Sequence, residues 1–310
     1  MTLAQAPLLV DGARHSAQTF RMMIKDLSRG AEGVTEAADL KVTPLPVPGG
    51  GVQVADGSAV IRGKANAWQG SYTAYNIGSA TVPIAPTGAT PRSDLIVLRV
   101  SDPEFEGGLD PTKDAINYFD VIPNVSPTTT SVPKGVTGIA IARVDLPANT
   151  GTVTSGMIRD LRRVANPRRE RTLYTAYPTK LSKAFRDDDQ WHDWPPEARW
   201  TIPVPDWATK LIVTVTIAGL RMDYDSLLGK LRLIFGTVQG QHTMVDDNQG
   251  KVVRRSTAIV ADTLTLPADY RGTSQVLYLQ ANMSKNWKGD LGTDAGTSII
   301  ADVEFTEGPV

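Results

Sequence analysis

The segment from residue 187 to residue 194 carries the side chains best suited to chemistry, because it places acids beside aromatic rings. Indole faces stack on pyranose rings, and carboxylates either accept hydrogen bonds from sugar hydroxyls or act as an acid–base pair. The segment therefore contains a candidate saccharide site, which consists of Trp191, Trp194, Asp187, Asp189 and Asp193. An exposed acidic turn, whose tryptophans anchor a loop to a β-sandwich, is the alternative interpretation. Calcium binding is weakly supported, since residues 187–189 lack the alternate spacing of a calcium loop.

Residues that other kinds of site need are missing. The chain has no cysteine, which excludes thiol catalysis, disulfides and cysteine-ligated zinc. Its three histidines, His15, His192 and His242, stand at no metal-ligand spacing. No phosphate loop and no Gly-x-Ser-x-Gly elbow occurs. We therefore expect a non-enzymatic protein with no metal and no cofactor.

The bulk properties narrow the range of partners. The 310 residues include 21% charged residues and carry a formal net charge of -1. Nucleic-acid-binding proteins usually carry a basic excess or a basic face, so we expect no nucleic-acid partner. No window approaches the roughly 18 apolar residues that span a bilayer, so we expect no membrane insertion. Residues 1–10 lack a basic n-region, and we expect no signal peptide there.

One amphipathic helix is predicted from Ser16 to Arg29. Ser16 is a suitable N-cap, and Gly30 follows where a left-handed residue often ends a helix. The helix carries an apolar stripe at i, i+3, i+4 and i+7, formed by Phe20, Met23, Ile24 and Leu27. This stripe packs either on the protein's own sheet or on a symmetry mate. The second alternative makes these four residues a candidate oligomer interface.

The rest of the chain favours short strands joined by turns, because glycine (27) and proline (21) are plentiful. Asp56-Gly57 predicts a hairpin over residues 51–62, and residues 211–217 alternate as a half-buried strand does. Further strands are predicted at residues 72–76, 81–84, 94–100, 118–122, 138–144, 230–238, 252–261, 275–283 and 298–304. The predicted fold is mainly β: an N-terminal β-rich module with one amphipathic helix, followed by a C-terminal jelly-roll-like β-sandwich.

A run of six arginines between Arg159 and Arg171 marks the expected domain boundary. Such a run is usually a solvated linker or a partner-facing surface, and a phosphate-binding patch is the less favoured alternative. We place an N-terminal domain at residues 1–165, an Arg-rich linker at residues 166–184 and the sandwich at residues 185–310. Four tryptophans fall within residues 191–207. A single strand cannot bury so many on one face, so we expect some of them at an interface.

The N-terminal half resembles the minor tail or baseplate proteins of long-tailed bacteriophages, especially phages of actinobacteria. The resemblance covers roughly residues 15–165 and rests on the order and spacing of several segments. These are the helix start His15-Ser16-Ala17 with Phe20, followed by residues 51–61 (GVQVADGSAVI), 69–72 (QGSY), 91–100 (PRSDLIVLRV), 138–144 (GIAIARV) and 158–163 (IRDLRR). The C-terminal half shows no family motif.

The resemblance implies a structural component of a phage tail tip or baseplate. The N-terminal half would dock on other tail or baseplate proteins, and the C-terminal sandwich would be displayed. Related tail appendages are often three-fold, so a homotrimer is expected, with the predicted helix as its seam. The expected location is the tail tip of a virion that is assembled in the host cytoplasm. The alternative function is receptor binding, in which the sandwich recognises a host cell-surface glycan.

Overall fold

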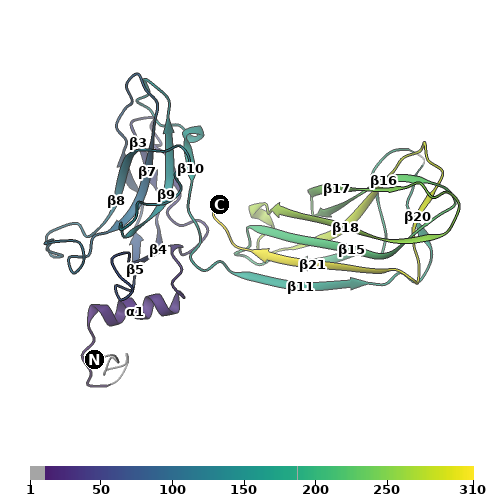
Figure 1. Ribbon diagram of the computed structural model, residues 1–310, viewed down its shortest axis with the longest axis horizontal. Coiled ribbons are helices and arrows are strands. Elements are labelled where there is room, and N and C mark those ends of the chain that lie inside the picture. Colours follow the sequence, from purple (N-terminus) through teal and green to yellow (C-terminus); the bar gives the residue numbers. More distant parts are fainter. Residues whose placement is uncertain (1–10, 187) are drawn as a thin grey trace. The chain divides into compact units, whose positions relative to one another are not determined.

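The computed structural model describes residues 11–186 and 188–310, and the chain divides into two units (Figure 1). Unit 1 extends to Pro167 and takes in the last residues, Gly308–Val310, whereas unit 2 consists of Arg168–Glu307. Strands dominate both units, and α1 (Ala17–Leu27) is the single α-helix of the described residues. The predicted mainly β fold is confirmed. No helix in this described part is long and apolar enough to cross a membrane.

Unit 1 is built from three small antiparallel sheets that share one hydrophobic core. Ser16 caps α1 as predicted, since its hydroxyl accepts the Thr19 backbone N–H at 3.2 Å. Strand β7 is buried along most of its length and so lies at the centre of this core. In sheet order the strands are β1 (Gly33–Val34), β4 (Gly57–Arg62) and β5 (Ser71–Asn76); β2 (Val42–Pro44), β3 (Gly51–Val54) and β6 (Ala80–Pro83); and β10 (Ile158–Asp160), β9 (Gly138–Leu146), β7 (Arg92–Val100) and β8 (Asn117–Val125).

The predicted hairpin over residues 51–62 is wrong. Strand β3 pairs with β2 and β6, whereas β4 pairs with β1 and β5, so the two strands lie in different sheets. The chain before them explains why. The Leu40 N–H donates to the Asp56 carbonyl, and Asp39 lies so close to Gly57 that a Cβ there would be 2.6 Å from the Asp39 Cα. The inserted segment takes the hydrogen bonds that a hairpin would use.

Arg162, a member of the arginine run, is a buried residue of unit 1 instead of part of a solvated surface. Its guanidinium pairs with Asp160 at 2.7 Å and donates to the carbonyl oxygens of Ala37, Asp39 and Val310. Buried guanidinium groups need such partners, because an unsatisfied charge inside a protein is costly. This arginine therefore ties the last residue of the chain back to unit 1.

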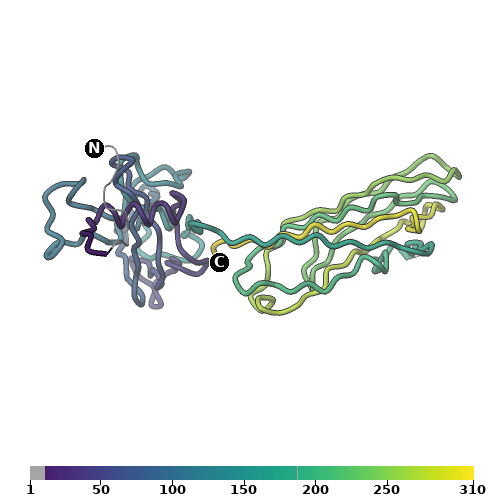
Figure 2. The backbone as a smooth tube through the Cα atoms, turned by 90° about the horizontal axis from the view of Figure 1, so that it is seen from below, coloured from purple at the N-terminus to yellow at the C-terminus, as the bar shows by residue number. Residues whose placement is uncertain are grey.

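Unit 2 is a β-sandwich whose two sheets have jelly-roll strand order. One sheet has the order β11 (Arg169–Ala176), β21 (Ser298–Thr306), β15 (Lys210–Asp223) and β18 (Arg254–Thr265). The other has the order β14 (Arg199–Pro203), β19 (Ser274–Met283), β16 (Leu227–Phe235) and β17 (Val238–Asp247). Figure 2 shows these long strands running side by side along unit 2. The short strands β12 (Ser182–Lys183), β13 (His192–Asp193) and β20 (Asp290–Thr293) extend the sheets at their ends.

The core of the sandwich comes from strict alternation along the strands. In β15, Leu211, Val213, Val215 and Ile217 are fully buried, as the sequence pattern predicts. Strand β16 alternates in the same way. The sequence prediction of one strand over residues 230–238 is incomplete, because a turn at residues 236–237 separates β16 from β17. Gly236 allows that turn, since its φ is +60°.

Strand β11 occupies part of the segment that we expected to be an Arg-rich linker, residues 166–184. It pairs over eight residues with β21. Arg169 lies 3.6 Å from Glu304, and Arg171 pairs with Asp302, so the arginines meet acids on the neighbouring strand. Tyr174 and Ala176 also pack against the core of unit 2. This part of the charge run is therefore one edge of the sandwich, where exposed arginines also form cross-strand ion pairs.

This strand determines which fragment of the chain should fold alone. We predict that a fragment of residues 168–307 melts cooperatively with β-type circular dichroism. A fragment of residues 185–310 lacks β11 and β12, and we expect it to be less stable by about 3 kcal/mol or more, which lowers the melting temperature by roughly 10 °C. Equal melting temperatures of the two fragments would show that β11 is dispensable.

Candidate functional site

The helix α1 packs on unit 1 through its polar face. Gln18, Arg21 and Lys25 lie on one side of the helix, and each donates to a backbone carbonyl of the segment before β5. The donor–acceptor distances are 3.2 Å to Trp68, 2.8 Å to Gln69 and 2.8 Å to Ala67, in that order. Figure 1 shows α1 next to β5. The face that the sequence pattern marks as solvent-facing is thus the face that contacts the protein.

Arg21 holds the helix in this orientation. The residue is only 7% exposed, and its guanidinium lies 5.7 Å from the Tyr72 ring centroid and 5.3 Å from that of Phe105. It pairs with Asp102 at 3.2 Å and with Glu104 at 2.6 Å. The Tyr72 hydroxyl also donates to Asp102, at 2.7 Å. Burial, followed by this hydrogen bond, raises the pKa of Tyr72 well above its ordinary value, so the tyrosine stays a neutral donor.

The apolar stripe of α1 faces away from unit 1. Leu27 is 76% exposed and Phe20 is 46% exposed, and Met23 and Ile24 are partly exposed. Phe20 and Leu27 therefore do not pack on the described sheets of unit 1, and the oligomer interface stays a prediction. Burying such side chains is worth about 1.5–3 kcal/mol each, so an exposed row of them is typical of a surface that contacts another molecule.

The described candidate saccharide residues divide between the core and the surface of the sandwich. Asp187 lies outside the described residues. Trp194 is 3% exposed and belongs to the core of the sandwich, so a role in binding a ligand at the surface is excluded for it. The Trp194 backbone N–H donates to the Leu279 carbonyl. Asp193, the last residue of β13, is exposed, and Trp194 directly after the strand is turned inward. Sequence alone could not assign the two faces of this short strand.

The two remaining carboxylates are already engaged by basic or amide groups. Asp189 accepts the Lys285 backbone N–H at 2.8 Å and lies 3.1 Å from its ammonium group, and these contacts lower the pKa of Asp189. Asp193 accepts from Gln280 at 2.9 Å and lies 3.3 Å from Arg199. Each is a positioned surface acid. No group of three metal-ligating side chains occurs in the described part of the chain.

Trp191 lies on a surface with several polar groups, and Asp193 contacts the same surface through Gln280. Its ring sits 4.1 Å from the Arg232 guanidinium and 6.4 Å from the His242 ring. Arg232 on β16 is opposite Gln280 on β19 and His242 on β17, so these side chains form one row across the sheet. We name this surface the β16 outer face, and define it by Lys230, Arg232, Gln280, Asn282, His242 and Met244.

Sequence reasoning missed the β16 outer face. One signal was present, because Leu231 and Leu233 alternate with Lys230 and Arg232 and so turn these two basic residues to the opposite side. The strand partners that complete the row lie about fifty residues away in sequence on β19. No local pattern connects them to β16.

The other tryptophans of the 191–207 cluster serve the sandwich itself. Trp200 and Trp207 are partly buried against its core, and the Arg168 guanidinium lies 5.6 Å from the Trp207 ring centroid. Of the four tryptophans that we expected to divide between core and interface, Trp191 alone reaches the β16 outer face. Trp68 of unit 1 is exposed and lies beside α1, where its carbonyl accepts from Gln18.

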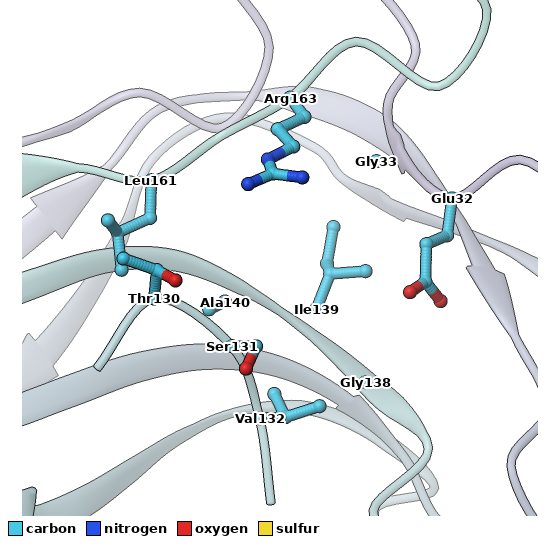
Figure 3. A pocket seen from close by; sticks show the side chains of 10 residues that line it. All are labelled: Glu32, Gly33, Thr130, Ser131, Val132, Gly138, Ile139, Ala140, Leu161 and Arg163. Atoms are coloured by element: carbon cyan, nitrogen blue, oxygen red, sulfur yellow. The ribbon is translucent and has the colours of Figure 1, made fainter. Parts of the chain in front are cut away.

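A small cavity in unit 1 is shown in Figure 3. Arg163 and Glu32 reach toward it from one side and the Thr130–Val132 loop from the other, and Ile139 and Ala140 also line it. Its volume is about 140 Å³, below the roughly 300–1,000 Å³ of ordinary ligand sites. Glu32 is paired with Lys64 at 2.7 Å. None of the predicted site residues lines this cavity, and its contents are limited to a few small molecules such as water.

The orientation of α1 makes a direct prediction. Replacing Arg21 with Met leaves Asp102 buried without its cation, so we expect the Arg21→Met variant to destabilise α1 and its contacts by about 3 kcal/mol. The Leu27→Ala variant should change stability by less than about 0.5 kcal/mol, because Leu27 is exposed. Hydrogen exchange of the α1 amides measures both. If the apolar stripe contributed to the core, Leu27→Ala would be the more damaging change.

Comparison with known proteins gives no family for this chain. No protein-family model matches, and no curated protein matches. Among solved structures, the chain is similar to a structure of the infectious bursal disease virus Gx strain, with 9% identity, 89% of this chain and 75% of that chain covered, and a TM-score of 0.29. A VP2 subviral particle of the same virus gives 11% identity, 90% and 75% coverage and a TM-score of 0.28. The insecticidal delta-endotoxin Cry8Ea1 of Bacillus thuringiensis has 7% identity and a TM-score of 0.20, with 90% of this chain and 52% of that chain covered. TM-scores this low carry no statement about function.

Proposed function

We propose that this protein is a non-enzymatic structural component of a virion, at the tail tip or baseplate of a long-tailed phage. The tail assignment is supported by the sequence resemblance over residues 15–165. The observation that carries an assembly role is the outward apolar stripe of α1. A helix fixed by a buried arginine, with its apolar side chains on the outside, is suited to contact another protein.

The partner proposed for the stripe is two further copies of this chain. Phe20, Met23 and Leu27 have the i, i+3 and i+7 spacing of a helical seam, in which like helices pack around a symmetry axis. A three-fold arrangement agrees with the tail appendages that the sequence resembles. The helix has only eleven residues, so it would supply one part of a larger contact between copies of unit 1 and other tail proteins.

The test compares the stripe with a matched position elsewhere on unit 1. We expect the Phe20→Glu, Leu27→Glu double variant to remain folded but to lose trimer formation, as measured by light scattering after gel filtration. Phage particles grown with the variant should lack the protein. Val47→Glu is the control, because Val47 is 79% exposed and outside α1, and it should leave assembly unchanged. A wild-type monomer at all concentrations, or normal incorporation of the double variant, would overturn the role of the stripe.

Saccharide recognition by unit 2 is the second candidate function, and Trp191 favours it. A partly exposed indole beside a sheet face that carries amide and imidazole groups is suited to stacking on a sugar ring. This proposal differs from the one made on sequence alone, since the ligand would contact Trp191 and the β16 outer face but not Trp194. Trp191→Ala should abolish binding of the full chain to isolated cell-envelope saccharide, measured by sedimentation with the envelope fraction.

A further inference from the structure

We propose that the β16 outer face binds a saccharide that carries an acidic substituent, with the anion held by Lys230 and Arg232. This inference rests on the second candidate function above and adds the chemical class of the ligand. It depends on three features of the face: two basic groups without acidic partners, a hollow next to them, and an aromatic ring above one of them.

The two basic side chains point to the same side of the sheet. Leu231 and Leu233, their neighbours along β16, are fully buried, so Lys230 and Arg232 project outward two residues apart. On β19 the residues opposite them are Asn282 and Gln280. Amides therefore flank the basic groups on that side, and Met244 and His242 flank them on β17.

Arg232 donates its hydrogen bonds to neutral groups. Its Nε and one terminal nitrogen donate to the Gln280 amide oxygen at 2.9 and 2.7 Å, and the other terminal nitrogen donates to the Gln239 amide oxygen at 2.8 Å. Within the described residues, neither Arg232 nor Lys230 forms an ion pair with a carboxylate. Two arginines of the opposite sheet differ, since Arg221 pairs with Asp223 and Arg255 with Asp294.

The partial burial of Arg232 makes an anion favourable at this place. Trp191 covers the guanidinium at 4.1 Å, and burial lowers the pKa of Arg232 below its ordinary value. The group still carries its charge at neutral pH, because an arginine cannot lose its proton there. A charge that has lost part of its water and donates its hydrogen bonds only to amides is stabilised by an incoming carboxylate, sulfate or phosphate.

A hollow of about 320 Å³ adjoins Lys230 and gives room for a ring. It is lined by Asp189, Leu228, Gly229, Lys230, Met244, Asn282 and Ser284. The volume is at the lower end of small-ligand sites. Its polar groups are an ammonium, an amide and a hydroxyl, which suit sugar hydroxyls and an acid, and the Asp189 carboxylate is already held by Lys285. Met244, 48% exposed, supplies an apolar wall.

The experiment uses the full chain and a ligand whose charge can be removed chemically. Oligogalacturonate carries a carboxylate on every ring, and its methyl ester has the same rings without charge. We expect the acid to bind at least tenfold more tightly than the ester by calorimetry, and its affinity to fall as salt increases. A polymer of sugar phosphates, measured in parallel, tells whether carboxylate or phosphate is preferred.

The variants separate this face from the rest of the sandwich. Arg232→Gln and Lys230→Gln remove charge and should each weaken binding of the acid about tenfold, with little effect on the ester. Arg255→Gln is the matched control, because Arg255 lies on β18 in the opposite sheet, and it should leave the affinity unchanged. If Arg232→Gln does not fold, as judged by its melting curve, Lys230→Gln and the ester comparison still decide.

The outcomes distinguish saccharide recognition from the preference for an acidic saccharide. Equal binding of acid and ester, abolished by Trp191→Ala, would overturn the acidic class and leave saccharide recognition standing. Binding of the acid that is insensitive to both Lys230→Gln and Arg232→Gln would overturn the placement of the anion. Absence of binding to the acid, the ester and the sugar-phosphate polymer would overturn saccharide recognition as well.

Discussion

The buried ion pair between Arg21 and Asp102 decides how unit 1 presents its only described helix. A guanidinium between two aromatic rings, with a carboxylate and a backbone carbonyl as partners, holds the polar side of α1 against the segment before β5. The cost of leaving either charge unpaired keeps this contact closed. As a result, Phe20 and Leu27 stay exposed to solvent, and a partner could bury them. If α1 packed through its apolar side, these side chains would already be buried on the sheets of unit 1.

In unit 2 the residues along each long strand alternate between the core and the surface. The inward apolar residues stabilise the fold, and the outward residues form the surface. The inner positions of β15 and β16 are leucine, isoleucine and valine, and these close the sandwich without buried charge. The outer positions are free to carry other groups. At the edge of the sandwich, Arg169 and Arg171 of β11 meet acids on β21. On the β16 outer face, the strand neighbours of Lys230 and Arg232 on β19 are amides instead, and this difference supports the recognition surface that we propose.

The arginine run shows how one sequence feature can divide among several roles. Arg162 closes unit 1 by holding Asp160 and the carbonyl of Val310, whereas Arg169 and Arg171 belong to the edge strand of unit 2. The two units divide after Pro167, inside this run. Within the segment expected to be a linker, residues 169–176 form strand β11, which pairs with β21 more than 120 residues later in the sequence.

The sequence by itself determined the mainly β fold, the ends of the helix and the inward faces of the long strands, because these depend on local spacing and capping. Ser16 caps the helix, and Leu211 to Ile217 alternate as expected. Only the tertiary structure decided which side of α1 is buried, that β3 and β4 belong to different sheets, and that Trp194 is core while Trp191 lies beside Arg232. Each of these depends on partners brought from far along the chain, such as Asp102 for Arg21 or Gln280 for Arg232. The periodicity of apolar residues shows that a helix or strand has two different sides, and contacts with residues far along the chain decide what each side packs against.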